Sequence, residues 1–248
     1  MRLHRLVETF EAESQRCAGL APLFTLALDA AQELGFDRLA MVHGLWFRRR
    51  DAGLIRLDNF GDYADLFISR RYYRDDPALL ACQRTSLAFS WDRIGEILPL
   101  GDRQHQILRE AARHGLRSGI SLPINVLGEP PGCCSFGSAR DSRPGRWPCR
   151  AAALIGAMAF ERARHLCGFP RMAAALPPIS PRKLEVLRFA AIGKTDPEIA
   201  LILGLSRMTI ETYMGQLRQA FDVYSRTQLC VTALRLGLIA FDDAISGF

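Results

Sequence analysis

The polar side chains between residues 207 and 218 are of types that can recognise the edges of nucleic-acid bases. A carboxylate such as Glu211 accepts a hydrogen bond from the cytosine amino group, and a glutamine such as Gln216 pairs with adenine. The alternative is that both are solvated surface residues. Base contacts are predicted from Met208, Thr209, Glu211, Thr212 and Gln216. Phosphate contacts are predicted from the basic side chains in or beside the segment, which are Lys194, Arg207, Arg218 and Arg226.

The cysteines are the other residues that could do chemistry. The chain has seven, at scattered positions and without the CxxC spacing of a zinc site, so buried free thiols are the expected state. The adjacent pair Cys133 and Cys134 could form a reactive or redox-sensitive site, although neighbouring thiols on a strand are usually core residues. A nucleophilic cysteine beside His105 or His114 is the enzyme alternative, and no spacing supports it. We predict no enzyme, no metal site and no cofactor.

Helices must position the candidate base contacts. Hydrophobic periodicity in the C-terminal part predicts four of them, over 181–193, 196–204, 207–221 and 226–238. Ser180 and Thr195 are in position to cap helix starts, and Gly193 and Gly204 fit helix ends. The short link GLS between the second and third helices gives a helix-turn-helix layout, although periodicity alone does not separate a DNA-binding pair from a plain helical hairpin.

The preceding part of the chain mixes strand and helix periodicities. Strands are predicted over 37–47, 56–60, 119–126 and 133–139, and helices over 63–73, 77–84, 102–115 and about 148–167. Antiparallel hairpins flanked by helices predict an α+β fold, an α-β-α sandwich with an antiparallel sheet. Prolines at both ends of 168–181 mark a joint. We therefore predict a sensor domain over 1–168, a linker over 169–178 and an all-α, four-helix domain over 179–248.

Composition limits the class of protein. At 248 residues, with 49% hydrophobic and 23% charged side chains, the chain can form two modest globular domains. The longest apolar run, 151–160, is well short of the ~20 residues that cross a bilayer. The start has no secretory signal, so we expect a cytoplasmic protein without membrane contact. The net charge of +6 suits an acidic partner.

The C-terminal segment contains the motifs ISPRKLEVL, GKTDPEIALILGLSRMTI and VYSRTQL. This pattern resembles the GerE-like module of LuxR-type transcription factors, which implies binding to double-stranded promoter DNA. Lys183, Tyr213 and Ala220 depart from the residues usual in that family. Because a phosphate-reaching lysine is often found at the position of Ala220, each copy has few phosphate anchors, and we expect a homodimer. The predicted pairing surface is on the last helix, at Leu229, Val231, Leu234 and Leu236.

The preceding part of the chain contains a second spaced pattern, made of Tyr63, Phe67, Asp76 with Pro77, Trp91, and Gly119 with Pro123. The pattern resembles the autoinducer-binding domain of LuxR-type quorum sensors, over about residues 20–168. A phosphorylated receiver domain is another common partner of GerE-like modules. It is excluded because it needs a lysine beside its acidic pocket, and residues 1–182 contain none.

The resemblance implies a small-molecule signal, an N-acyl or aryl homoserine lactone, in an apolar pocket with a few directed polar groups. Asp76 would accept a hydrogen bond from the ligand amide, and Trp91 would wall the lactone ring. The alternative for Asp76 is a cap on the helix that begins at Pro77.

Two aromatic positions depart from the sensor pattern. Tyr63 stands where the family has a tryptophan that donates to the lactone carbonyl, and Phe67 lacks the hydroxyl of the usual tyrosine. Asn59 could replace that hydroxyl, and Ser135 could contact substituents on the acyl chain. Because each lost bond reduces discrimination by about 1–3 kcal/mol, an unusual lactone, another small molecule and no ligand all remain open. Without a ligand, the domain could act as an anti-activator that pairs with another regulator.

Overall fold

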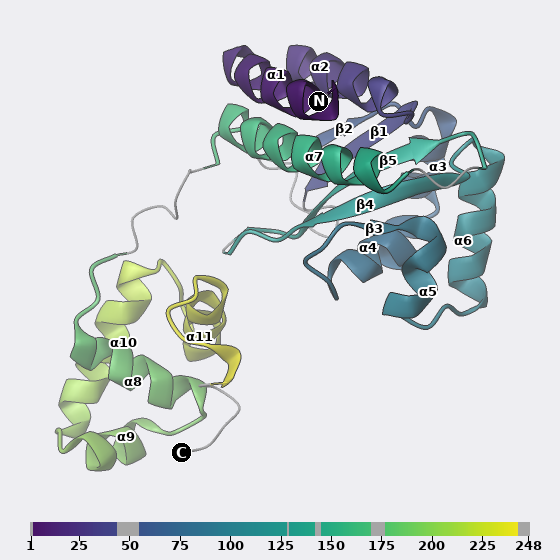
Figure 1. Cartoon of the computed structure of the whole chain (residues 1–248). Helices are drawn as coiled ribbons and strands as arrows, with labels where there is room; N and C mark the ends of the chain where they lie inside the picture. Colours follow the sequence, from purple (N-terminus) through teal and green to yellow (C-terminus); the bar gives the residue numbers. More distant parts are fainter. Residues whose placement is uncertain (1, 44–54, 128, 142–144, 170–176, 243–248) are drawn as a thin grey trace. The chain divides into compact units, whose positions relative to one another are not determined.

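The computed structural model describes residues 2–43, 55–127, 129–141, 145–169 and 177–242. The chain divides into two compact units, one of 1–126 with 130–171 and one of 172–248 with 127–129. The first combines helices with a sheet, whereas the described residues after 177 form only helices (Figure 1). This confirms the predicted fold class. The limits predicted for the two domains and the linker stay predictions.

The first unit is built on an antiparallel sheet with the strand order β2-β1-β5-β4-β3. Its strands are β1 (Arg38–His43), β2 (Arg56–Asp58), β3 (Phe89–Ser90), β4 (Ser118–Ile124) and β5 (Gly132–Ser138). The hairpin of β4 and β5 confirms the pair predicted over 119–139. The turn predicted at 48–53, between β1 and β2, lies outside the described residues.

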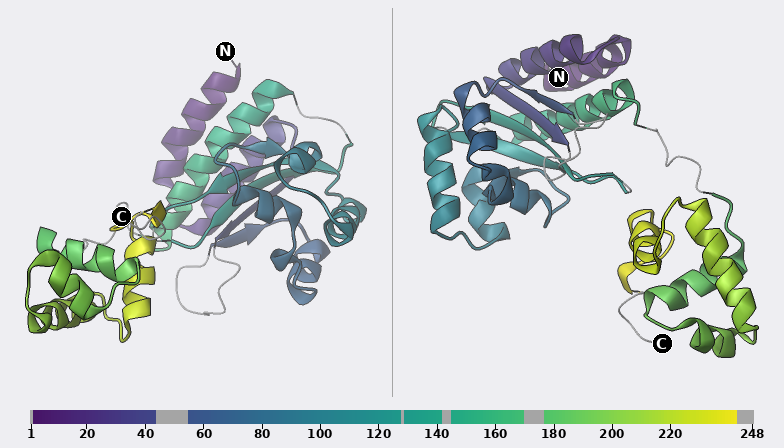
Figure 2. Two further views of the ribbon diagram at one scale, coloured as in Figure 1. Left: turned by 90° about the horizontal axis from the view of Figure 1, so that it is seen from below. Right: turned by 180° about the vertical axis from the view of Figure 1, so that it is seen from behind.

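Helices cover both faces of this sheet (Figures 1 and 2). One face is covered by α1 (Arg2–Arg16), α2 (Leu20–Glu33) and α7 (Arg146–Leu166), and the other by α3 (Asp62–Ser69), α4 (Pro77–Cys82), α5 (Ile94–Ile97) and α6 (Asp102–Arg113). The sequence analysis missed α1 and α2. The start of α2 carries little signal, since it follows Gly19 without a capping side chain. None of the helices within the described ranges is long and apolar enough to cross a membrane.

Strand alternation gives the two faces of the sheet different chemistry, because successive side chains point to opposite sides. On β1 and β5, Leu39, Met41 and Phe136 are fully buried in one large apolar core with α1, α2 and α7. The intervening residues Ala40 and Ser135, which are register partners, face the other layer. The sheet therefore separates a dry core from a partly polar surface that lies against α3, α4 and α6.

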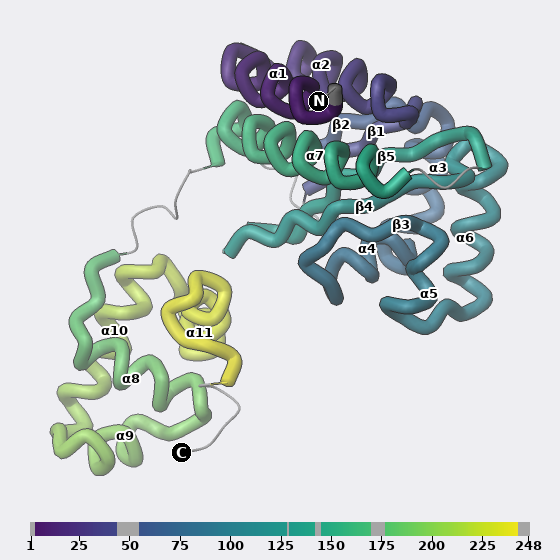
Figure 3. The backbone as a smooth tube through the Cα atoms, viewed as in Figure 1, coloured from purple at the N-terminus to yellow at the C-terminus, as the bar shows by residue number. Residues whose placement is uncertain are grey.

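The second unit consists of α8 (Pro181–Ala191), α9 (Asp196–Leu203), α10 (Arg207–Ala220) and α11 (Arg226–Arg235), traced in Figure 3. These confirm the four predicted helices, whose C-terminal ends come one to three residues earlier. Ser180 caps α8 by accepting a hydrogen bond from the backbone N–H of Lys183. Gly204, at φ 63°, ends α9 in the left-handed conformation that glycine adopts without steric cost. Local signals in the sequence thus set where helices of this unit begin and end.

Candidate functional site

The first unit contains a cavity of about 100 Å³ between the polar face of the sheet and helices α3, α4 and α6. Five of the six residues predicted to contact a ligand line it: Tyr63, Phe67, Asp76, Trp91 and Ser135. Most of the other lining side chains are apolar: Ala40, Val42, Phe60, Ala64, Ile68, Ala78, Leu79, Leu108, Ala111 and Leu116. Such a wall suits a largely apolar molecule with a few directed polar groups.

Asp76 is held in the cavity wall by the helix that it caps. Its Oδ1 accepts a hydrogen bond from the backbone N–H of Leu79 at 2.9 Å, and Pro77 occupies the first position of α4. Burial raises the pKa of the carboxyl to about 6, and the backbone N–H groups of Leu79 and Ala78 offset part of that rise. The cap and the ligand contact are compatible, because the carboxyl lines the cavity while its Oδ1 accepts the capping hydrogen bond.

Tyr63 brings an unused hydrogen-bond donor to the cavity. Its side chain is only 4% exposed, yet its hydroxyl makes no hydrogen bond with the residues that the structure describes. Burial, followed by the negative charge of Asp76, raises the pKa of Tyr63, so the phenol stays protonated. The hydroxyl is nevertheless not among the fully buried polar atoms that lack a partner, so it opens onto the space of the cavity. A ligand acceptor in the cavity could therefore receive a hydrogen bond from it.

The indole N–H of Trp91 is used inside the wall. Its Nε1 donates to Ser121 Oγ at 2.9 Å, and Ser121 Oγ lies 2.8 Å from Ser135 Oγ. Trp91 therefore offers its ring, not its N–H group, to the cavity, in keeping with the predicted wall role. The sequence analysis missed Ser121, although it stands two residues after Gly119 and so shares its face of β4.

Two glycines make room for the Trp91 ring. A Cβ at Gly119 would lie 2.4 Å from the carbonyl oxygen of Phe136 and 2.8 Å from Trp91 Cη2. A Cβ at Gly137, on the neighbouring strand, would lie 3.0 Å from the same ring atom. Close approach of the indole to the backbone of β4 and β5 is the physical reason for glycine at the start of the G-x-x-x-P strand.

Two charged residues in the cavity wall were also missed. Arg56 and Asp58 lie on β2, where they pair with Val42 and Ala40 of β1. Because β2 alternates, both side chains share the face that lines the cavity. The alternation of two charged residues with Leu57 between them was the signal that could have identified them.

The structure places Asn59 away from the cavity, which corrects its predicted role. Its Oδ1 accepts a hydrogen bond from the backbone N–H of Leu39 at 2.7 Å, and its Nδ2 donates to the carbonyl of Asp37 at 3.0 Å. Both ends of the amide thus pair with the backbone at the start of β1. Asn59 does not replace the hydroxyl that is absent at Phe67.

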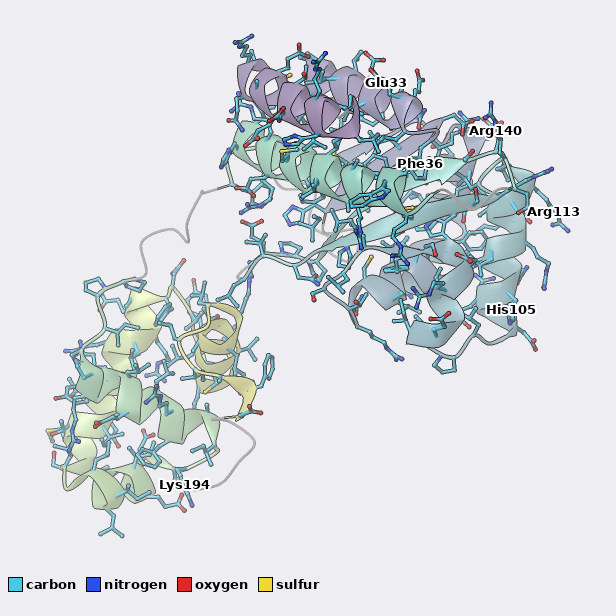
Figure 4. All side chains as sticks on the ribbon, viewed as in Figure 1. Glu33, Phe36, His105, Arg113, Arg140 and Lys194 are labelled. Atoms are coloured by element: carbon cyan, nitrogen blue, oxygen red, sulfur yellow. The ribbon has the colours of Figure 1, made fainter. Side chains whose placement is uncertain are left out.

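The adjacent thiols of β5 point to opposite faces of the sheet. Cys133 lies with its Sγ 3.3 Å from Cys82 Sγ, whereas Cys134 belongs to the apolar core, where burial raises its pKa. His105 is exposed on α6 (Figure 4) and has no contact with either thiol. This geometry gives no support to a cysteine nucleophile. All seven cysteines are free, and the described residues contain no group of three potential metal ligands.

The candidate base contacts lie on α10, the second helix of the helix-turn-helix. Its N-cap is Ser206, which accepts a hydrogen bond from the backbone N–H of Thr209 at 3.1 Å. Ile210, Met214 and Leu217 are buried in the core of the unit. The opposite side presents exposed side chains from Arg207, Met208, Glu211, Thr212 and Gln216. This helix can therefore offer a polar face to a groove of DNA without unfolding.

Some of these exposed side chains already pair with one another. Arg207 Nε lies 2.7 Å from Glu211 Oε1, and Thr212 Oγ1 donates to the carbonyl of Met208 at 2.8 Å. The Arg207–Glu211 ion pair is exposed and spans one helical turn, so it is worth only about 0.3–0.5 kcal/mol. It can open if DNA offers better partners.

Two predictions for the start of α11 need correction. The guanidinium of Arg226 donates to the carboxylate of Asp196 and the carbonyl of Lys194, so it ties α11 to the start of α9 and is not free for phosphate. Leu229 is fully buried in the core, so it cannot belong to a pairing surface, whereas Val231 is 58% exposed. Lys194, marked in Figure 4, keeps 44% of its side chain exposed.

Two family models match the chain. The autoinducer binding domain matches residues 20–163, and the luxR family of bacterial regulatory proteins matches residues 177–233. The quorum sensing-dependent transcriptional regulator RpaR of Rhodopseudomonas palustris is 26% identical over 94% of this chain and 88% of its own. The transcriptional activator protein TraR of Agrobacterium vitis is 24% identical over 96% of this chain and 98% of its own. Both matched domains therefore occur together in relatives of similar length.

Solved structures share the fold. The crystal structure of Escherichia coli SdiA superimposes with a TM-score of 0.65 at 21% identity, covering 94% of this chain and 98% of SdiA. A complex of SdiA with octanoyl-rac-glycerol superimposes with a TM-score of 0.62 at 20% identity, covering 96% of this chain and 97% of SdiA. At this identity the likeness establishes the architecture: a sandwich of helices and antiparallel sheet followed by a helical module.

Proposed function

Because this chain belongs to the luxR family of bacterial regulatory proteins, we propose that a homoserine-lactone signal binds its cavity and controls its binding to promoter DNA. The chain is a quorum-sensing transcriptional regulator with an autoinducer-binding domain and a helix-turn-helix. Its relatives are regulators and not enzymes. In this proposal it works in the cytoplasm as a homodimer.

The observation that carries the proposal is the pair of polar groups in an otherwise apolar cavity wall. The hydroxyl of Tyr63 is a donor without a partner among the described residues, and the carboxyl of Asp76 is an acceptor that lines the same wall. An N-acyl homoserine lactone has carbonyls for the first, an amide N–H for the second and an apolar tail for the rest of the wall. Trp91 would pack against the lactone ring.

Binding would act on the fold through mass action. A ligand that binds only the folded first unit stabilises it by RT ln(1 + [L]/Kd), which is about 2.7 kcal/mol at a hundredfold excess over Kd. Since the ligand fills a cavity between sheet and helices, it also favours the conformation in which these layers are packed. The DNA-binding modules of a dimer would then be held at the spacing of two half-sites.

Promoter recognition would use the exposed face of α10. Gln216 is exposed, and Glu211 could contact a base edge once its surface pair with Arg207 opens. Arg207, Arg218 and Lys194 are the basic groups near that face. With Arg226 committed to Asp196, one copy has few phosphate anchors. Two copies on one site double the contacts, which favours a homodimer.

A second candidate is a regulator that responds to a different lipid-like molecule. The structural neighbour SdiA has been solved with octanoyl-rac-glycerol, whose hydroxyls could also donate to a carboxylate such as Asp76. A third is a ligand-independent anti-activator that pairs with another regulator.

Thermal unfolding with and without candidate signals tests these readings. We expect an acyl or aryl homoserine lactone to raise the midpoint of the full chain, and Asp76→Asn to reduce this shift strongly. Asp75→Asn is the matched control, because Asp75 lies next in sequence but pairs with Arg103, 3.5 Å away, outside the cavity wall. A shift from octanoylglycerol alone would favour the second candidate. Equal folding and DNA binding with and without every ligand would favour the third.

A further inference from the structure

We propose that Arg56 and Asp58 make the cavity selective for a signal whose tail ends in a hydroxyl group, an inference that rests on the proposed function. Both residues line the cavity, and with Asp76 they are its only charged lining residues within the described part of the chain. Asp76 would accept a hydrogen bond from the amide N–H of the signal. The pair on β2 has no role in binding a plain alkyl tail.

The position of β2 in the sheet puts this pair at the tail end of the cavity. Trp91 lies over β4 and β5, against Gly119 and Gly137. The strand order is β2-β1-β5-β4, so β2 is two strands away from β5. At the usual strand spacing this is about 10 Å. A signal with its lactone against Trp91 therefore extends its tail across β1 toward Arg56 and Asp58.

The hydrogen-bonding groups of the pair are not fully used. Arg56 Nε is 3.5 Å from Asp58 Oδ2, and Arg56 Nη2 is 4.0 Å from Asp65 Oδ1. The Arg56 side chain makes no hydrogen bond within the described ranges. Asp58 Oδ1 accepts one weak bond, from the backbone N–H of Phe60 at 3.3 Å. A ligand can therefore gain bonds here without breaking strong ones.

The charges around the pair select a neutral hydroxyl. A hydroxyl can accept from Arg56 and donate to Asp58 at the same time. A carboxylate would be attracted to Arg56 but would also meet the negative charges of Asp58 and Asp65, and an ammonium would be repelled by Arg56. A terminal methyl would displace water from the two charged groups and replace none of their bonds, which is unfavourable.

The test is the dissociation constant of the full chain for matched N-acyl homoserine lactones, from hexanoyl to dodecanoyl, each with a methyl, hydroxyl or carboxylate at the end of the tail. We expect the best hydroxyl-ended lactone to bind about tenfold tighter than the alkyl lactone of equal length. The carboxylate-ended lactone should bind more weakly than the hydroxyl-ended one.

Two variants locate the source of the preference. In the double variant Arg56→Met with Asp58→Leu, the ratio between hydroxyl-ended and alkyl lactones should fall to about one, because the donor and the acceptor for the hydroxyl are both removed and apolar side chains remain. Asp65→Asn is the control, since Asp65 is 93% exposed and does not line the cavity, and it should leave the ratio within about twofold of the parent. Midpoints of the unliganded proteins check folding, and Arg56→Leu with Asp58→Leu substitutes if the methionine variant is unstable.

The outcomes separate this inference from the proposed function. If alkyl lactones bind as tightly as hydroxyl-ended ones, or if the preference survives in the double variants, the inference is wrong while the cavity is still a lactone site. If lactones with every kind of tail fail to bind, both the inference and the proposed function are wrong.

Discussion

Tyr63 in the cavity and Gln216 on α10 are both polar side chains at predicted contact sites, but their surroundings differ. The Tyr63 side chain is buried and its hydroxyl has no hydrogen-bond partner among the described residues, so the hydroxyl is directed into a cavity with mostly apolar walls. Gln216 is exposed, and water satisfies its amide in the absence of DNA. An unpaired polar group in a cavity therefore supports ligand binding by itself. An exposed polar face on a helix supports DNA binding only together with the match to a family of DNA-binding regulators.

The two sites also differ in how they are assembled. The cavity draws its walls from strands β1, β2 and β5 and from helices α3, α4 and α6, which are far apart in the sequence. The base contacts come from one helix. Changes in the cavity should therefore alter stability and ligand response together, while changes on α10 should alter DNA binding alone.

The largest expected effect is a dependence of stability on pH that originates at Asp76. Its pKa is about 6 in the folded chain, above the ~3.9 of an unfolded aspartate. The folded state therefore binds the extra proton, and stability falls as pH rises between about 4 and 6, by roughly 3 kcal/mol. Asp76→Asn removes this loss, because an asparagine can keep the cap without ionising. Urea unfolding of the unliganded parent and variant at pH values from 4 to 7 measures how the free energy of unfolding changes with pH.

Tryptophan fluorescence is the suitable probe, since all three tryptophans of the chain, Trp46, Trp91 and Trp147, belong to the first unit. Parallel pH profiles of parent and Asp76→Asn would contradict the prediction. A ligand that donates to the carboxylate should in turn bind more tightly above pH 6 than below it, because the charged form is then present.

Gly119→Ala should damage the cavity by overpacking. The new methyl would meet the Trp91 ring and the carbonyl of Phe136, so the indole must move, at a cost of about 1–3 kcal/mol. We expect a lower thermal midpoint and a weaker response to ligand. Gly95→Ala is the control, since a Cβ there has no neighbour within 4 Å. Unchanged ligand response in Gly119→Ala would show that Trp91 does not shape the site.

In the second unit, Arg226→Met should lower stability by about 1 kcal/mol, because the bonds to Asp196 and Lys194 tie two helices together on a partly exposed surface. Arg218→Met should leave stability nearly unchanged and weaken DNA binding. Circular dichroism of helix unfolding measures the first effect, and gel shift of promoter DNA the second. If the two variants lost equal stability, the structural assignment of Arg226 would be wrong.

The smallest effect is expected for Lys194→Ala. Removal of one phosphate contact should reduce the slope of log K against log salt by about 0.9 per copy, without changing sequence preference. Glu211→Ala is the informative partner, because loss of a base contact should change preference among sites and leave the slope unaltered. Binding isotherms over a range of salt concentrations distinguish the two.

Local signals in the sequence were sufficient for the helical unit. Ser180, Gly204 and the apolar spacing at Ile210 and Met214 define helices through interactions over one turn, so the positions of α8 to α11 could be predicted. The periodicity of α10 likewise predicted which of its side chains lie on the exposed face. The partner of Arg226 could not, because Asp196 is 30 residues away and meets it only when α9 and α11 pack.

For the sensor unit, the fold class could be predicted from the pattern of residues, and Tyr63, Asp76 and Trp91 could be selected through resemblance to a family. That Arg56 faces the cavity, and that Asn59 pairs with the backbone of β1, became visible only in the folded chain. Strand register accounts for this difference. A shift of one residue turns every side chain of a strand to the opposite face, and the pairing of β1 with β2 and β5 sets that register through hydrogen bonds between distant segments.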